Sequence, residues 1–131
     1  ESSVPAVAAV WQTTGFGEGS DFAWFTSAPA LDAPTLVSVP AGPSPRLQLA
    51  NGGTEATTVT LRSLTGGVEQ TIELAAGGSA SGALSGGTVW TLDPGSSDQV
   101  HAQITYAGAG ALAGFAVWQG DAAAAPVVVY P

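Results

Sequence analysis

Apolar and polar residues alternate along most of this chain. The stretches VEQTIEL (68–74) and VHAQITY (100–106) both repeat with a period of two. Such alternation is typical of a β-strand with one buried face. No stretch of about ten residues keeps a helical period through the frequent Gly, Pro and β-branched residues. The pattern therefore predicts about ten short strands and essentially no α-helix.

One hairpin is predicted to the level of register. Val59 and Leu61 must share the core face with Ile72 and Leu74, because successive side chains point to opposite faces of a strand. A two-residue loop at 66–67 would pair Leu61 with Ile72 and Val59 with Leu74. The two glycines of this loop also suit a type I′ turn, in which both loop residues have positive φ.

The preceding turn, NGGT at 51–54, does not fit a simple hairpin. A two-residue loop there would put Leu47 and Leu49 on the face opposite to Val59. Either the loop is longer, or the chain crosses between two sheets at this point. Many short strands with one apolar face each are best buried by two sheets packed face to face. We expect an all-β protein, an antiparallel β-sandwich of immunoglobulin-like or jelly-roll-like type.

The two ends of the chain resemble each other. With Val7 aligned to Val100, the segments 7–25 and 100–118 share one Val, two Ala, two Gly and one Phe. Each then passes through an Ala/Pro segment to an apolar run, 34–40 or 126–131, whose flanking prolines favour a sheet edge.

We interpret residues 1–131 as a single sandwich domain. Within it, 1–40 would be a strand-turn-strand-strand copy of 100–131, joined by the Pro-rich linker 40–45. We expect the two copies to superpose. The alternative is the end of one repeat unit followed by the whole of the next.

Charge limits the possible partners. The chain has ten acidic residues and only two basic ones, Arg46 and Arg62. It has no lysine, and its net charge is -8. Nucleic acids and anionic membrane surfaces require several basic side chains, so this charge argues strongly against both.

Cysteine is absent, which excludes disulfides, thiolate metal sites and a Cys nucleophile. No uncharged stretch reaches the roughly 20 apolar residues of a membrane helix, so we expect no membrane insertion. The first residue is Glu1 rather than Met, so we expect a processed or excised piece.

Residues suited to catalysis are few. His101 is the single histidine, and the alternation places it outward between Gln99 and Gln103. The G-x-S-x-G motif of a strained nucleophile elbow does not occur. Two of the scattered carboxylates could form a glycosidase pair, since that reaction needs only an acid and a nucleophile or base at a suitable separation. We expect a protein that is not an enzyme and has no cofactor.

The loop DPGSSD at 93–98 is the one candidate metal site. Asp93 and Asp98 supply carboxylates and the two serines supply hydroxyl groups, which could hold Ca²⁺ weakly. The spacing is not that of an EF-hand. The alternative is an Asp-Pro-Gly turn without a metal ion.

Aromatic residues are the stronger sign of function. The candidate ligand-binding residues are Trp11, Phe16, Trp24, Trp90 and Trp118. β-Sandwiches that bind sugars present exposed Trp or Tyr rings on which pyranose rings stack, and the same residues otherwise fill a core. Alternation within 21–25 (DFAWF) places Phe22 and Trp24 on one face. That strand is therefore either buried on both faces or carries exposed aromatic side chains.

Three segments together resemble a known group of proteins. They are VHAQITYAGAGALAGFAVW (100–118), the VVVYP or LVSVP strands flanked by Ala and Pro, and the hairpin PSPRLQLANGGTEATTVTLRS (43–63). The combination is similar to secreted, Ala/Gly-rich repeat proteins of unknown function from high-GC Gram-positive bacteria. The resemblance implies export and an extracytoplasmic β-sandwich, secreted or at the cell surface. It assigns no functional residue.

We therefore expect a non-catalytic extracytoplasmic module that acts in cell-envelope structure, adhesion or protein–protein interaction. Its partner would be another protein or a second copy of itself, joined through sheet edges by β-augmentation. The alternative is a carbohydrate-binding module that holds a cell-wall glycan on exposed Trp side chains.

Overall fold

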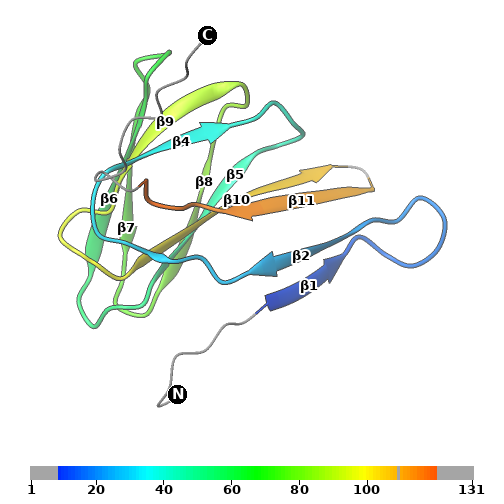
Figure 1. Ribbon diagram of the computed structural model, residues 1–131, viewed down its shortest axis with the longest axis horizontal. Coiled ribbons are helices and arrows are strands. Elements are labelled where there is room, and N and C mark those ends of the chain that lie inside the picture. The colour runs from blue at the N-terminus through cyan, green and yellow to red at the C-terminus, as the bar shows by residue number, and fades with distance from the viewer. Residues whose placement is uncertain (1–8, 109, 121–131) are drawn as a thin grey trace, which may run out of the picture.

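The computed structural model describes residues 9–108 and 110–120 as an antiparallel all-β protein (Figure 1). The strands are β1 (Ala9–Thr13), β2 (Phe22–Thr26), β3 (Ala30–Leu31), β4 (Thr35–Val39), β5 (Arg46–Asn51), β6 (Thr57–Ser63), β7 (Glu69–Leu74), β8 (Ser79–Ala83), β9 (Thr88–Asp93), β10 (Val100–Gly108) and β11 (Ala111–Ala116). This confirms the expected all-β, sandwich-like class. In the same residues, no helix is long and apolar enough to cross a membrane.

Two sheets enclose the core. One has the order β11-β10-β5-β8, with the short β3 also paired to β10, and the other has the order β4-β9-β6-β7. Their facing sides bury a cluster of large apolar side chains that includes Leu31, Leu47, Leu61, Trp90, Leu92 and Ile104. Burial of each such side chain contributes about 1.5–3 kcal/mol, so this cluster dominates the stability of the fold.

Crossings between the sheets explain the irregular turn at 51–54. β5 and β6 lie in different sheets, so the crossing, one of the two alternatives that the sequence left open, is correct. The side chain of Asn51 is buried here. Its Nδ2 donates to the carbonyl oxygens of Glu55 (2.8 Å) and Ala75 (3.2 Å), and its Oδ1 accepts from the Gly53 N–H. Residues 40–45 likewise connect β4 in one sheet with β5 in the other.

The β6–β7 hairpin has a longer loop than the one predicted. Val59 pairs with Ile72, and Leu61 pairs with Gln70. The N–H of Ser63 donates to Val68 O at 2.8 Å, so residues 64–67 form the loop. Of its two glycines only Gly67 has a positive φ, 63°, so the predicted type I′ turn is wrong. The core face is unchanged, because a slip of two residues returns every side chain to the same face.

Both of the similar chain ends contain an antiparallel hairpin, β1–β2 and β10–β11. Trp11 pairs with Trp24, whereas Ile104, which aligns with Trp11 in the sequence, pairs with Phe115. The two hairpins therefore differ by two residues in register. Val7 and the run 126–131 lie outside the described residues, so the superposition of the complete segments stays a prediction.

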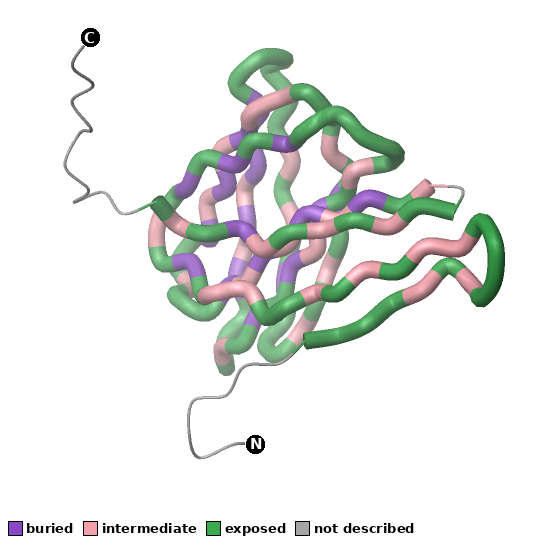
Figure 2. The backbone as a smooth tube through the Cα atoms, turned by 45° about the vertical axis from the view of Figure 1, so that its right-hand side comes forward, coloured by how far each residue is buried: buried purple, intermediate pink, exposed green. Residues whose placement is uncertain are grey.

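The β1–β2 hairpin forms a two-stranded sheet of its own, and β2 lies alongside β11 (Figure 1). In Figure 2 the sandwich strands carry buried segments, whereas the hairpin is exposed or intermediate along its whole length. The fold therefore consists of a well-packed sandwich and a hairpin attached to its surface.

Candidate functional site

Three aromatic side chains share the outward face of the β1–β2 hairpin. Trp11 lies opposite Trp24, and Thr13 lies opposite Phe22. Directly opposed residues in an antiparallel pair point to the same face. Trp11 is 45% exposed, Phe22 58% and Trp24 62%. Of the two alternatives for residues 21–25, a strand with exposed aromatic side chains is therefore correct.

Phe16 extends this surface beyond the strands. It lies in the loop between β1 and β2, is 91% exposed, and its ring centroid is 6.4 Å from that of Trp11. The base of the loop is closed by two hydrogen bonds of 2.9 Å, from Thr14 N to Asp21 O and from Asp21 N to Thr14 Oγ1. We call Trp11, Phe16, Phe22 and Trp24 the aromatic face.

The opposite face of the hairpin attaches it to the sandwich. The ring of Phe25 packs directly on Gly114 of β11, where a Cβ would overlap it. The carboxylate of Asp21 accepts from Phe22 N and from Leu112 N, both at 2.8 Å. Gln103 Nε2 donates to Thr26 O. These contacts fix the orientation of the hairpin, so the aromatic face points away from the sandwich.

The remaining tryptophans do not belong to this surface. Trp90 is buried in the core at 2% exposure, and its Nε1 donates to Thr88 Oγ1 at 2.7 Å. Its ring is therefore closed to a ligand in this structure, contrary to its place among the candidate residues. Trp118 is 70% exposed but follows the end of β11, next to Val117, whose N–H donates to Ala102 O.

The loop at 93–98 has the geometry of a turn. Asp93 Oδ1 accepts from Gly95 N at 2.9 Å, and Gly95 has a φ of 72°. Asp98 Oδ1 accepts from the side chain of Gln99 at 3.4 Å. Within residues 9–108 and 110–120, no group of three His, Cys, Asp or Glu side chains gathers to hold a metal ion. The weak Ca²⁺ site stays a prediction, and the turn accounts for the position of Asp93.

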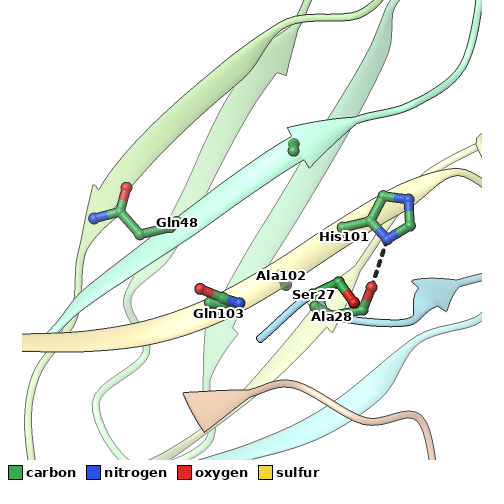
Figure 3. Close-up of a pocket in the computed structure, with 7 residues that line it drawn as sticks. Ser27, Ala28, Gln48, His101, Ala102 and Gln103 are labelled. Carbon is green, nitrogen blue, oxygen red and sulfur yellow. Dashed lines mark hydrogen bonds between the residues drawn. The ribbon is translucent and has the colours of Figure 1, made fainter. Parts of the chain in front are cut away.

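His101 lies beside a shallow groove on the outer face of β10 (Figure 3). The groove has a volume of about 390 Å³, and its lining includes Ser27, Gln48 and Gln103. His101 Nδ1 is 2.9 Å from Ala28 O, which ties the chain that follows β2 to this face. The ring is thus engaged in a structural contact.

Alternation identified Phe22 as a neighbour of Trp24, but two residues that position the aromatic face were missed. The sequence did not distinguish Asp21 from the other scattered acidic residues, which were interpreted as aiding solubility. In the structure its carboxylate joins the hairpin to β11. Gly114 interrupts an otherwise regular strand, and a glycine inside a strand often marks the close approach of another group. That signal could have indicated the contact with Phe25.

The chain was compared with protein-family models, curated proteins and solved structures. None of the three comparisons gives a match.

Proposed function

We propose that this chain is a non-catalytic binding module, secreted or at the cell surface, whose aromatic face contacts another protein of the cell envelope. One observation carries the proposal: four large aromatic side chains on one hairpin are 45–91% exposed. Contiguous exposed apolar patches are uncommon on soluble monomers and frequently mark interaction sites. Trp and Phe are also enriched at the centres of protein–protein interfaces, where a few such residues supply most of the binding energy.

The chemistry of the aromatic face favours a protein partner with an apolar patch. Phe16 and Phe22 carry no hydrogen-bonding group, so they gain most from contact with apolar side chains. Glu18 is exposed in the same loop, and the net charge of the chain is -8. A basic rim around the partner's apolar patch would complement this charge and speed association.

One further feature supports the proposal. The resemblance of three segments to secreted repeat proteins supports a location outside the cytoplasm.

Site-specific photocrosslinking tests the proposal. A photoreactive residue at Thr26, which shares a face with Trp24, should crosslink a partner, whereas the same residue at Ala83 on the far edge strand β8 should not. With the crosslinked partner purified, Trp24→Ala should weaken its binding about 30-fold or more, as expected for an interface hot spot of about 2 kcal/mol. Leu64→Ala is the matched control, because Leu64 is 57% exposed in the β6–β7 loop.

Two results would contradict the proposal. One is equal crosslinking from Thr26 and Ala83, and the other is an affinity unchanged by both Trp11→Ala and Trp24→Ala.

Carbohydrate binding is the second candidate. The opposed pair Trp11 and Trp24 presents two neighbouring indole rings to solvent, a surface on which sugar rings could stack. In this case purified cell-wall glycans should bind, Trp24→Phe should keep most of the affinity and Trp24→Ala should lose it. Phe22→Ala should lower the affinity for these glycans less than Trp24→Ala does. The absence of binding to every cell-wall glycan tested would reject this candidate and leave the first one standing.

A further inference from the structure

Part of the core-facing side of β11 is exposed, although the rest of its sheet packs against the opposite sheet. Ala111, Ala113 and Phe115 lie on the same side as Tyr106, which points into the core. Ala111 and Ala113 are nevertheless exposed, and Phe115 is 40% exposed. Together with residues 40–43, these side chains line an apolar groove of about 350 Å³. The groove is therefore lined by apolar side chains like those of the core, although several of them are exposed to solvent.

The opposite sheet ends where this cover is needed. Its last strand, β4, pairs with β9 and with no other strand in the part of the chain that the structure describes. The hydroxyl of Tyr106 donates to Pro40 O, directly after β4, at 2.9 Å, so the end of β4 adjoins the groove. On the outer side of β4, Leu36 is 65% exposed. A strand added beside β4 would turn one face toward the groove, and its other face would lie beside Leu36 on the outer side of the sheet.

The run PVVVYP at 126–131 suits that position. A continuous apolar run gives a strand apolar side chains on both faces, one set toward the groove and one beside Leu36. Three consecutive Val residues and a Tyr also have a high preference for extended structure. The run belongs to the eleven residues that follow Gly120 in the sequence.

The residue Gln119, just before this segment, lies close to the start of β4. Gln119 Oε1 accepts from Asp32 N at 3.0 Å, and β4 begins three residues later at Thr35. An extended chain spans about 3.3 Å per residue, so residues 121–131 are long enough to run the length of this five-residue strand. A short tether also gives the segment an effective concentration in the millimolar range, which favours it over a second copy.

We propose that residues 126–131 pair with the free edge of β4 in the same chain and cover Ala113 and Phe115. Backbone hydrogen bonds along β4 and burial of the Val side chains in the groove supply the binding energy. The added strand also protects an edge that would otherwise be open to pairing with other chains. This site is separate from the aromatic face, so the two proposals can fail independently.

Engineered disulfides test the position of the segment. The natural chain has no cysteine, so an introduced pair reports only its own contact. Ala113→Cys is combined in turn with cysteine at Val127, Val128 and Val129. A disulfide requires Cα atoms within about 4.4–6.8 Å of each other. We expect at least one of the three pairs to close within a monomer under mild oxidation.

The control replaces Ala113→Cys with Ala83→Cys. Ala83 is also exposed, but it lies on β8 at the opposite edge of the same sheet. It should form no disulfide with the same three partners. Failure of all three Ala113 pairs would overturn the proposal. Predominantly disulfide-linked dimers would also overturn it, because they would place a second copy in the groove.

Hydrogen exchange provides an independent measurement. Removal of residues 126–131 should raise the exchange rates of those β4 amides that point to the free edge about tenfold, because they lose a hydrogen bond and its cover. Amides of β6, which has strand partners on both sides, should keep their rates. The synthetic peptide PVVVYP should restore protection of β4. Identical β4 exchange in the full and shortened chains would contradict the proposal.

Discussion

The sandwich and the β1–β2 hairpin contain the same kinds of side chain in different surroundings. Trp90 of β9 is 2% exposed, whereas Trp24 of β2 is 62% exposed, and both lie in the middle of β-strands. In the sandwich, two sheets cover each other's apolar faces. The hairpin has only one face against the sandwich, so its second apolar face meets solvent. A covering sheet, rather than residue type, decides whether a strand's aromatic face becomes core or contact surface.

The two regions also differ in how they are held. The sandwich is stabilised by a continuous core. The hairpin depends on Phe25 against Gly114, the carboxylate of Asp21 and the amide of Gln103. Segments with few buried apolar contacts open more readily than core strands. We therefore expect changes in the sandwich to affect global unfolding and changes in the hairpin to act locally.

The largest expected difference is between two Trp→Ala variants. Trp90→Ala removes a fully buried ring and should lower the free energy of unfolding by about 3–5 kcal/mol. Trp24→Ala removes an exposed ring and should change it by no more than about 0.5 kcal/mol. Urea unfolding followed by far-ultraviolet circular dichroism measures both without relying on Trp fluorescence. Similar losses in the two variants would show that the hairpin is part of the core and would break the comparison.

Contact between the hairpin and β11 should give the next largest effect. In Gly114→Ala the new Cβ meets the ring of Phe25 and lies 3.0 Å from Ile104 O. Such overpacking typically lowers stability by about 1–3 kcal/mol, and here it should weaken the attachment of the hairpin to the sandwich. Amides of β1 and β2 should exchange faster in this variant, while those of β6 should not change.

A double variant and a control separate this contact from a general effect of alanine. Phe25→Ala combined with Gly114→Ala should cost less than the sum of the single changes, because the clash requires the ring. Gly66→Ala is the control, since its nearest neighbours are 3.6 Å away and its φ is not positive. Strict additivity of the two single changes would show that Phe25 does not pack on Gly114.

Alternation in the sequence predicted strands and their faces, including the shared face of Phe22 and Trp24. It could not say which face another sheet covers, because that depends on contacts between residues distant in the sequence. For this reason the sequence alone does not distinguish Trp24 from Trp90. The predicted length of the β6–β7 loop was wrong for a local reason, because adjacent glycines permit a turn but do not set its length. Registers that differ by two residues also bury the same face, so the core pattern does not choose between them.

Tyr106 connects the core with the chain crossing at residues 40–43, and its pH dependence tests that contact. Burial raises the pKa of the Tyr106 phenol above its ordinary value of 10.0. Because the pKa is higher in the folded state, the associated stability is fully present below about pH 10. It is lost as the pH rises through the pKa of the folded state.

Urea unfolding between about pH 8 and pH 11 should therefore show a loss of stability at the alkaline end that is smaller in Tyr106→Phe. At neutral pH this variant also lacks the hydrogen bond to Pro40 O, which should cost about 1 kcal/mol. The same alkaline loss in both proteins would indicate that another group is responsible.

The smallest effect is expected from the one ion pair found among the described residues, on the outer surface of the sandwich. Arg62 lies directly opposite Glu69, with Nη2 and Oε2 2.8 Å apart and side chains 64% and 51% exposed. The direct pairing follows from the observed register; the predicted register, with Leu61 opposite Ile72, would put Arg62 opposite Thr71.

Exposed ion pairs are worth about 0.2–1 kcal/mol, because water already solvates both charges. A double-mutant cycle with Arg62→Ala and Glu69→Ala should give a coupling in this range at low salt. The coupling should shrink in about 1 M NaCl, where the Debye length falls to roughly 3 Å. A coupling that exceeded the expected loss from Gly114→Ala would reverse the order of effects. It would mean that surface charge stabilises the sandwich more than a single apolar contact holds the hairpin.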